Sequence, residues 1–177
     1  MKKVWIILGI VVVVGLAGLI VISAVAWPSL LRSRQAGNEA SAVATLRTVA
    51  SAQTSFTMAC GGDFYAPDLP TLGVTAPGVP PPFLPPDLTS AVSITRSGYA
   101  ITMGSTAGAA PTAPASCNGV PPATLVKGYW ATATPVAPEM GTRAFAINSD
   151  GIVWYAAQQT PIRVSDSGPP VGATEYK

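Results

Sequence analysis

Residues 28–56 read PSLLRSRQAGNEASAVATLRTVASAQTSF, and this stretch carries the pattern on which the fold depends. Apolar residues recur in it at three- and four-residue spacing, at Val43, Leu46, Val49, Ala50, Ala52 and Phe56. This spacing places an apolar stripe on one side of an α-helix and leaves polar residues such as Arg47 and Ser51 on the other. The stripe predicts an amphipathic helix at 28–60 that is half-buried against a sheet and ends at the Gly61-Gly62 pair.

Small residues dominate the first part of this helix. Ala36, Ala40 and Ala44 follow one another at four-residue spacing, so they share one side of the helix. Short side chains allow a neighbouring helix to approach closely. We therefore predict that these alanines are helix-packing positions that contact a partner protein.

An uncharged, apolar stretch precedes the amphipathic helix. From Val4 to Trp27 the sequence is VWIILGIVVVVGLAGLIVISAVAW, whose 24 residues would form a helix of ~36 Å, enough for a hydrocarbon core of ~30 Å. This predicts a cytoplasmic tail at 1–3, a single transmembrane helix at 4–27 and a bacterial inner-membrane location, with residues 28–177 periplasmic. The competing interpretation is a signal peptide cleaved after Ala26, since Ala24-Val25-Ala26 fits the small-x-small rule.

Four residues of this stretch are candidate contact positions. Trp5 and Trp27 are spaced to lie at the two membrane interfaces. Gly15 and Gly18 are candidates for packing against a neighbouring helix, although the stretch holds no GxxxG motif.

Charged residues are scarce and dispersed. They make up 10% of the chain, against roughly 25% in an average protein, and Lys2 and Lys3 account for the net charge of +2. A main domain without net charge gives no reason to expect a nucleic-acid partner. The chain has no histidine, and its acidic residues form no close pair, so we expect no enzyme activity, no metal and no cofactor.

Cys60 and Cys117 are the two cysteines of the chain. In an oxidising compartment they predict one disulfide, and in a reducing one they would remain two buried thiols.

Residues 61–177 are predicted to form the globular domain. Strands are expected at 98–104 (GYAITMG), at 128–134 (GYWATAT) and as a hairpin at 142–157 that turns at Asn148–Gly151. The proline-rich segment 76–87 (APGVPPPFLPPD) predicts a rigid extended loop, in preference to a ligand for SH3-type domains. The expected fold class is α+β, in which a long N-terminal helix, transmembrane in its first half, packs on a three- to four-stranded antiparallel sheet.

The helix sequence closely resembles the post-proline helix of bacterial type IV pilins and pilin-like proteins. The likeness continues through DFYAPDLPTLG (63–73), SGYAITM (97–103) and GYWATATPVAPEMGTRAFAINSDGIVWY (128–155). It implies a pilin-like fold, with a protruding helix wrapped by an antiparallel sheet, and an N-terminus inside the cell. Family members carry a cleavage glycine, a new N-terminal residue and a glutamate at positions that are Ile6, Ile7 and Val11 in this chain.

These features predict a non-enzymatic, single-pass structural or accessory subunit of a larger membrane assembly, such as a respiratory, photosynthetic or transport complex. Its expected partners are membrane lipid and the helices of other subunits. The alternative is a divergent pilin or pseudopilin that binds copies of itself in a filament or secretion system. A second alternative is a soluble periplasmic binding module released by signal peptidase.

Overall fold

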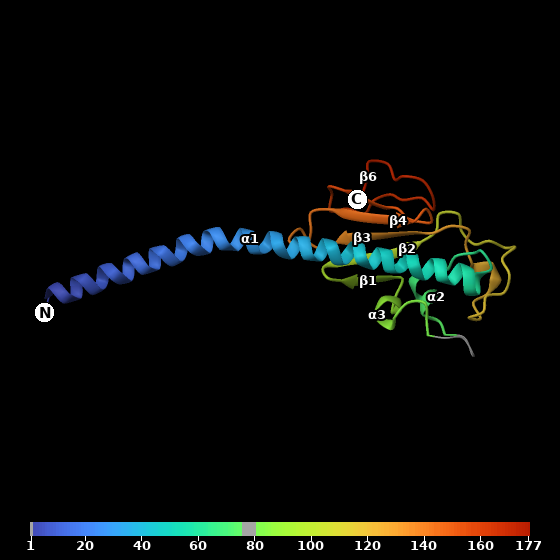
Figure 1. Ribbon diagram of the computed structural model, residues 1–177, viewed down its shortest axis with the longest axis horizontal. Coiled ribbons are helices and arrows are strands. Elements are labelled where there is room, and N and C mark those ends of the chain that lie inside the picture. The colour runs from blue at the N-terminus through green and yellow to red at the C-terminus, as the bar shows by residue number, and fades with distance from the viewer. Residues whose placement is uncertain (1, 76–80) are drawn as a thin grey trace.

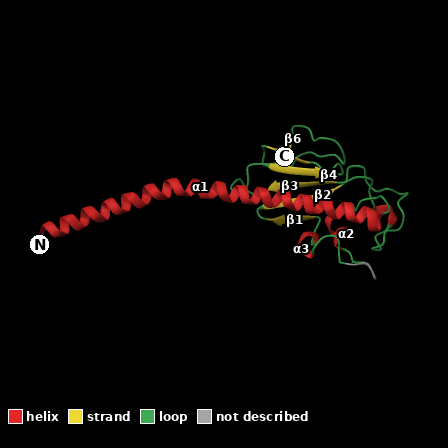
Figure 2. Ribbon diagram, viewed as in Figure 1, coloured by secondary structure: helices red, strands yellow, loops and turns green. Residues whose placement is uncertain are grey.

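One long helix organises the molecule. The computed structural model describes residues 2–75 and 81–177, and of residues 2–4, 6–28 and 122 it describes the backbone alone. Helix α1, Lys2–Phe56, runs through Pro28 without interruption. Its first half extends beyond the globular domain, and its second half lies across the sheet (Figures 1 and 2). A short π-helical turn, Thr57–Gly61, follows it.

The sheet has six antiparallel strands in the order in which they occur in the chain, β1-β2-β3-β4-β5-β6. Their bounds are Ser93–Arg96 for β1, Tyr99–Gly104 for β2, Trp130–Pro135 for β3, Ala144–Asn148 for β4, Val153–Ala156 for β5 and Thr174–Glu175 for β6. The β4–β5 connection turns at Asn148–Gly151, where Gly151 adopts a φ of 76°. The strands and the hairpin turn predicted at 98–104, 128–134 and 142–157 are thus confirmed.

The inner face of the sheet packs on α1 and forms the main core. Period-two alternation directs Tyr99, Ile101 and Met103 of β2 inward, and all three are buried. The apolar stripe predicted on the helix meets this face, since Leu46 and Val49 are both 0% exposed. Burying each such side chain contributes about 1.5–3 kcal/mol, so the stripe holds the second half of α1 in place.

The outer face of the sheet is covered over only part of its width. Beyond β4 and β5 the chain folds back, and a second small core forms from Ala144, Ala146, Ala156 and Ile162. Over β2 and β3 the outer face is instead lined by half-exposed residues such as Thr102 and Thr134. This division leaves one part of the sheet open to solvent.

Two short helices lie on either side of the described part of the predicted proline-rich loop, 81–87, whose residues 76–80 lie outside the described residues. They are α2, Leu69–Gly73, and α3, Pro86–Thr89, which begins inside the predicted loop; a 3₁₀ turn follows later at Pro122–Thr124. Asp68 caps α2 by accepting a hydrogen bond from the Thr71 backbone N–H. Leu72 and Leu88 anchor the two helices in the core. Only the cap and the N1/N2 prolines mark them in the sequence, because each is too short to show a helical period.

The prediction of three or four strands is wrong, since the sheet has six. The two additional strands lie at the edges. β1 reads SITR and exposes three of its four residues, and β6 has only two residues, both exposed. Segments this short and polar give no alternation from which a strand can be recognised.

The predicted membrane span is also contradicted. Within the described residues, no helix is both long and apolar enough to cross a membrane. Apart from Trp5, the side chains of α1 are described from residue 29 to residue 56, and this part carries Arg32, Arg34, Glu39 and Arg47. The expected inner-membrane location, with its N-terminus inside and residues 28–177 outside the cytoplasm, depends on the span at 4–27 and is contradicted together with it.

Candidate functional site

A polar contact secures α1 where it leaves the sheet. Glu39 is only 6% exposed, although it lies near the end of the domain. Its Oε1 accepts hydrogen bonds from the backbone N–H and the hydroxyl of Thr142, both at 2.9 Å. Its Oε2 accepts from Nε and Nη2 of Arg143 at 2.8 and 2.5 Å. Both carboxylate oxygens are therefore paired, as a buried charge requires.

Arg143 connects this carboxylate to the aromatic end of the core. The central guanidinium carbon lies 5.5, 5.3 and 5.8 Å from the ring centroids of Phe145, Tyr155 and Tyr176. These distances fall within the range of cation–π attraction. The single cation thus joins α1, β4, β5 and the segment that follows β6.

The electrostatics of the pair keep both groups charged. Burial raises the pKa of Glu39, but hydrogen bonds from Arg143 and Thr142 outweigh it and hold the pKa below its ordinary value. The hydrogen bond to Glu39 in turn raises the pKa of Arg143, against the opposing effect of burial. At neutral pH the contact is a closed ion pair.

Two further side chains of α1 extend the contact. Asn38 donates from Nδ2 to the Met140 carbonyl at 3.0 Å, and Gln35 donates from Nε2 to the Pro138 carbonyl at 3.2 Å. Residues 35–39 of α1 and residues 138–143 together form what we call the helix–loop contact. It fixes the direction in which the first half of α1 leaves the domain.

Gly141 gives this loop its close approach to the core, and Gly141→Ala should be strongly destabilising. An added Cβ would lie 1.9 Å from the hydroxyl oxygen of Tyr99, which donates a hydrogen bond to the Arg143 carbonyl at 2.9 Å. We expect a loss of about 2–3 kcal/mol in urea unfolding, because the ring or the loop must move. Gly37→Ala is the matched control. It meets nothing within 4 Å on α1 and should stabilise by up to about 1 kcal/mol. Equal stabilities for the two variants would contradict this account.

The predicted site residues fall in separate places. Ala36, Ala40 and Ala44 are exposed on α1, while the Val43, Leu46 and Val49 stripe faces the sheet, so the three alanines are available to a partner. Trp5 is 73% exposed. Gly15, Gly18 and Trp27 lie in the part of α1 of which only the backbone is described, so their predicted contacts lie outside what the structure describes.

The predicted disulfide is confirmed. Cys60 and Cys117 are joined across a sequence separation of 57 residues. The Cys117 backbone N–H also donates to the Cys60 carbonyl at 3.2 Å. The bond ties the long loop before β3 to the turn that ends α1.

Sequence reasoning missed the roles of Glu39 and Arg143. The two residues are 104 positions apart, and neither has a local pattern that distinguishes it from a solvated charge. One signal was available in the sequence. Glu39 directly follows Asn38 and lies four positions before Val43, which is buried. That spacing places it beside the core-facing stripe of the helix.

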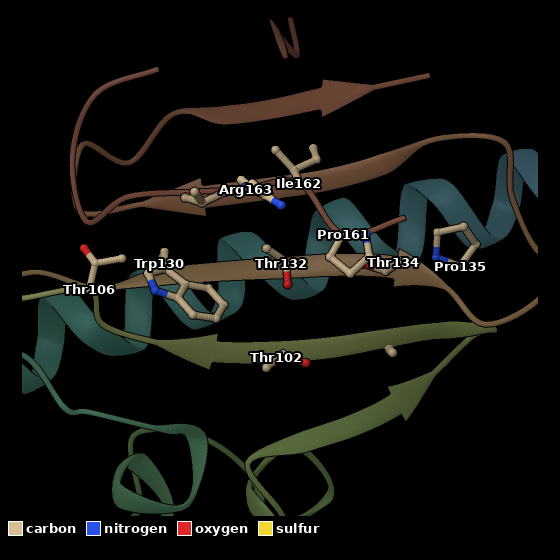
Figure 3. A pocket seen from close by; sticks show the side chains of 11 residues that line it. Thr102, Thr106, Trp130, Thr132, Thr134, Pro135, Pro161, Ile162 and Arg163 are labelled. Carbon is tan, nitrogen blue, oxygen red and sulfur yellow. The ribbon is translucent and has the colours of Figure 1, made fainter. Parts of the chain in front are cut away.

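A groove on the open part of the sheet is the second feature of interest. It has a volume of about 560 Å³ and lies over β2 and β3, beside residues 161–164 (Figure 3). Among the residues described, no group of His, Cys, Asp or Glu side chains is arranged to hold a metal ion.

Comparison with known proteins found no similar protein: no family model, no curated protein and no solved structure matches the chain.

Proposed function

We propose that this protein is a non-enzymatic structural subunit that joins a larger assembly through α1. The observation that carries the proposal is the first half of the helix, which extends beyond the globular domain (Figure 1). A helix without tertiary contacts gains little stability from propensity alone. Its sequence from Val4 to Trp27 contains no charged residue, so neighbouring helices of the assembly would stabilise it by burying apolar surface.

The helix–loop contact supports the same role. Glu39, Arg143 and Asn38 hold α1 on the sheet at the point where the helix leaves it. A subunit that docks by a projecting helix needs this junction to be rigid, because the junction sets the orientation of the domain in the assembly. The exposed Ala36, Ala40 and Ala44 extend the docking side past the junction, since short side chains permit helix axes to approach to about 8 Å.

The resemblance to type IV pilins supports assembly through a helix. In that family a glutamate near the start of the helix is thought to pair with the N-terminal amine of a neighbouring copy. Val11 occupies the corresponding position in this chain and cannot form that pair. This difference favours docking onto other subunits over a filament built from one chain.

Substituting Gly18 and Ala40 together with leucine tests the docking role. The tagged wild-type chain should be recovered from its native source with a fixed set of partner chains, and the double variant should recover at least about tenfold less of them, because leucine holds the helices apart. Ser55→Leu, an exposed position at the far end of α1, is the control and should recover the wild-type amount. Unchanged partner recovery by the double variant would refute the proposed interface.

N-terminal mass spectrometry of the same preparation distinguishes a docked subunit from the filament alternative. An intact Met1 agrees with a docked subunit. A processed terminus near Ile7, recovered with copies of this chain alone, would replace the proposal with a pilin-type filament.

A further inference from the structure

The sheet groove is the open space over the outer face of β2 and β3. It is lined by Ala100, Thr102, Thr106, Trp130, Thr132, Thr134, Pro135, Pro161, Ile162, Arg163 and Val164. Its volume of about 560 Å³ lies within the range of ~300–1,000 Å³ that is usual for small-molecule sites. Strands β2 and β3 form its floor, and the returning segment 161–164 lies along one side (Figure 3).

Threonines give the floor a mixed chemical character. The β2–β3 register places Thr102 opposite Thr132, and Thr134 two positions further along β3. The Thr102 hydroxyl is hydrogen-bonded to Ser93 at 2.9 Å. The hydroxyls of Thr132, which is 6% exposed, and of the half-exposed Thr134 form no hydrogen bond with the described part of the chain. Each threonine offers a methyl group beside a hydroxyl, so the floor contains both apolar and hydrogen-bonding atoms.

Trp130 supplies a flat apolar surface at the Thr106 end of the groove (Figure 3). Its indole lies against Gly104, where an added Cβ would come within 2.8 Å of the ring atom Cζ2. The absence of a side chain at Gly104 therefore lets the ring settle over the end of β2. The indole N–H is buried and has no hydrogen-bond partner among the described residues.

Arg163 is the one charged residue in the lining described above. It is exposed and forms no ion pair with the described residues. Asp166 follows closely in the chain, but its carboxylate accepts hydrogen bonds from the Ser105 hydroxyl and from the backbone N–H groups of Thr106 and Ala107. Arg163 thus keeps its positive charge available to the groove.

We propose that the sheet groove binds a short acidic oligosaccharide. A pyranose ring has an apolar C–H face and a rim of hydroxyls, which fits an indole platform beside Thr132 and Thr134, whose hydroxyls are unpaired within the described residues. The free charge of Arg163 is complementary to a carboxylate on the sugar. A peptide strand cannot extend the sheet here, because β2 and β3 are each paired on both sides. A hydrocarbon chain would leave the threonine hydroxyls without partners.

Binding can be tested with the full chain on an array of immobilised oligosaccharides. The array carries uronic-acid, sialylated and sulfated members, each beside its neutral counterpart. Saturable binding to an acidic member, confirmed by titration calorimetry with the soluble sugar, is the expected result. No saturable binding to any member, or equal binding to acidic and neutral counterparts, would overturn the proposal.

Four variants locate the binding to the groove. Thr132→Val removes one hydroxyl and should weaken binding about fivefold, and Trp130→Ala should weaken it at least about tenfold. Arg163→Gln should weaken binding of the acidic sugar and leave its neutral counterpart unchanged. Thr95→Val, on the exposed edge strand β1 and outside the groove, is the matched control and should bind as wild type.

Thermal unfolding of each variant keeps the result interpretable. Should Trp130→Ala fail to fold, Thr132→Val and Arg163→Gln decide the question, because the first is nearly isosteric and the second is at an exposed position. Wild-type affinity in both of these folded variants would show that the sugar binds elsewhere and would refute the groove as its site.

Discussion

Removing the disulfide by Cys60→Ala together with Cys117→Ser is expected to lower the free energy of unfolding by about 4 kcal/mol. The bond spans 57 positions, so its loss restores a large loop entropy to the unfolded chain. The same change releases the loop before β3, in which Ala110 and Ala113 are buried. Urea unfolding under non-reducing conditions measures the effect.

Reduction of the wild-type chain provides the control for this prediction. Dithiothreitol should bring the wild type to the stability of the double variant and should leave the variant itself unchanged. Coincident unfolding curves for the oxidised wild type and the variant would show that the bond contributes nothing.

Replacing Glu39 by glutamine is expected to cost about 2–3 kcal/mol at pH 7. The substitution keeps the shape of the side chain but leaves the partly buried Arg143 facing an amide. The exposed pair of Asp87 and Arg96 provides a matched control, because its members meet at 2.8 Å with side chains 61% and 45% exposed. Asp87→Asn should therefore cost no more than about 0.5 kcal/mol. Equal losses for the two variants would contradict the special role of the Glu39 pair.

The Glu39 pair also predicts a pH dependence with a defined sign. Native Glu39 has a pKa below its ordinary value of 4.5, so the unfolded chain binds the proton more readily than the folded one. Its contribution is complete above about 4.5 and is lost as the pH falls through the lower native pKa. The stability difference between wild type and Glu39→Gln should therefore shrink from pH 5 towards pH 3, and a constant difference would exclude this linkage.

The elements with a strong local pattern were predictable from the sequence. The stripe of Val43, Leu46 and Val49 repeats with the helical period, and its burial follows from that period alone. The hairpin is marked by the turn at Asn148–Gly151, whose glycine can adopt positive φ. The disulfide was predictable because the chain contains two cysteines. In each case a few neighbouring residues carry the whole signal.

Contacts between distant segments were not predictable in this way. Glu39 and Arg143 cannot be told from surface charges in the sequence, because only the fold places Arg143, just before β4, beside Glu39. The threonines of β3 line a groove only because residues 161–164 return over the sheet. The alternation in 128–134 did place Trp130, Thr132 and Thr134 on one face of a strand. The sequence of that strand does not indicate which segment of the chain lies over this face. The edge strands β1 and β6 were missed because they are too short to alternate.

The two edge strands of the sheet affect whether the protein aggregates at high concentration. A free strand edge recruits other chains by backbone pairing, and proteins avoid this with short or charged edge strands. One edge strand, β6, is two residues long. The other, β1, ends at Arg96, which forms a salt bridge with Asp87. Neither offers a template for cross-β aggregation, so high local concentrations should be tolerated without fibrillisation of the globular part.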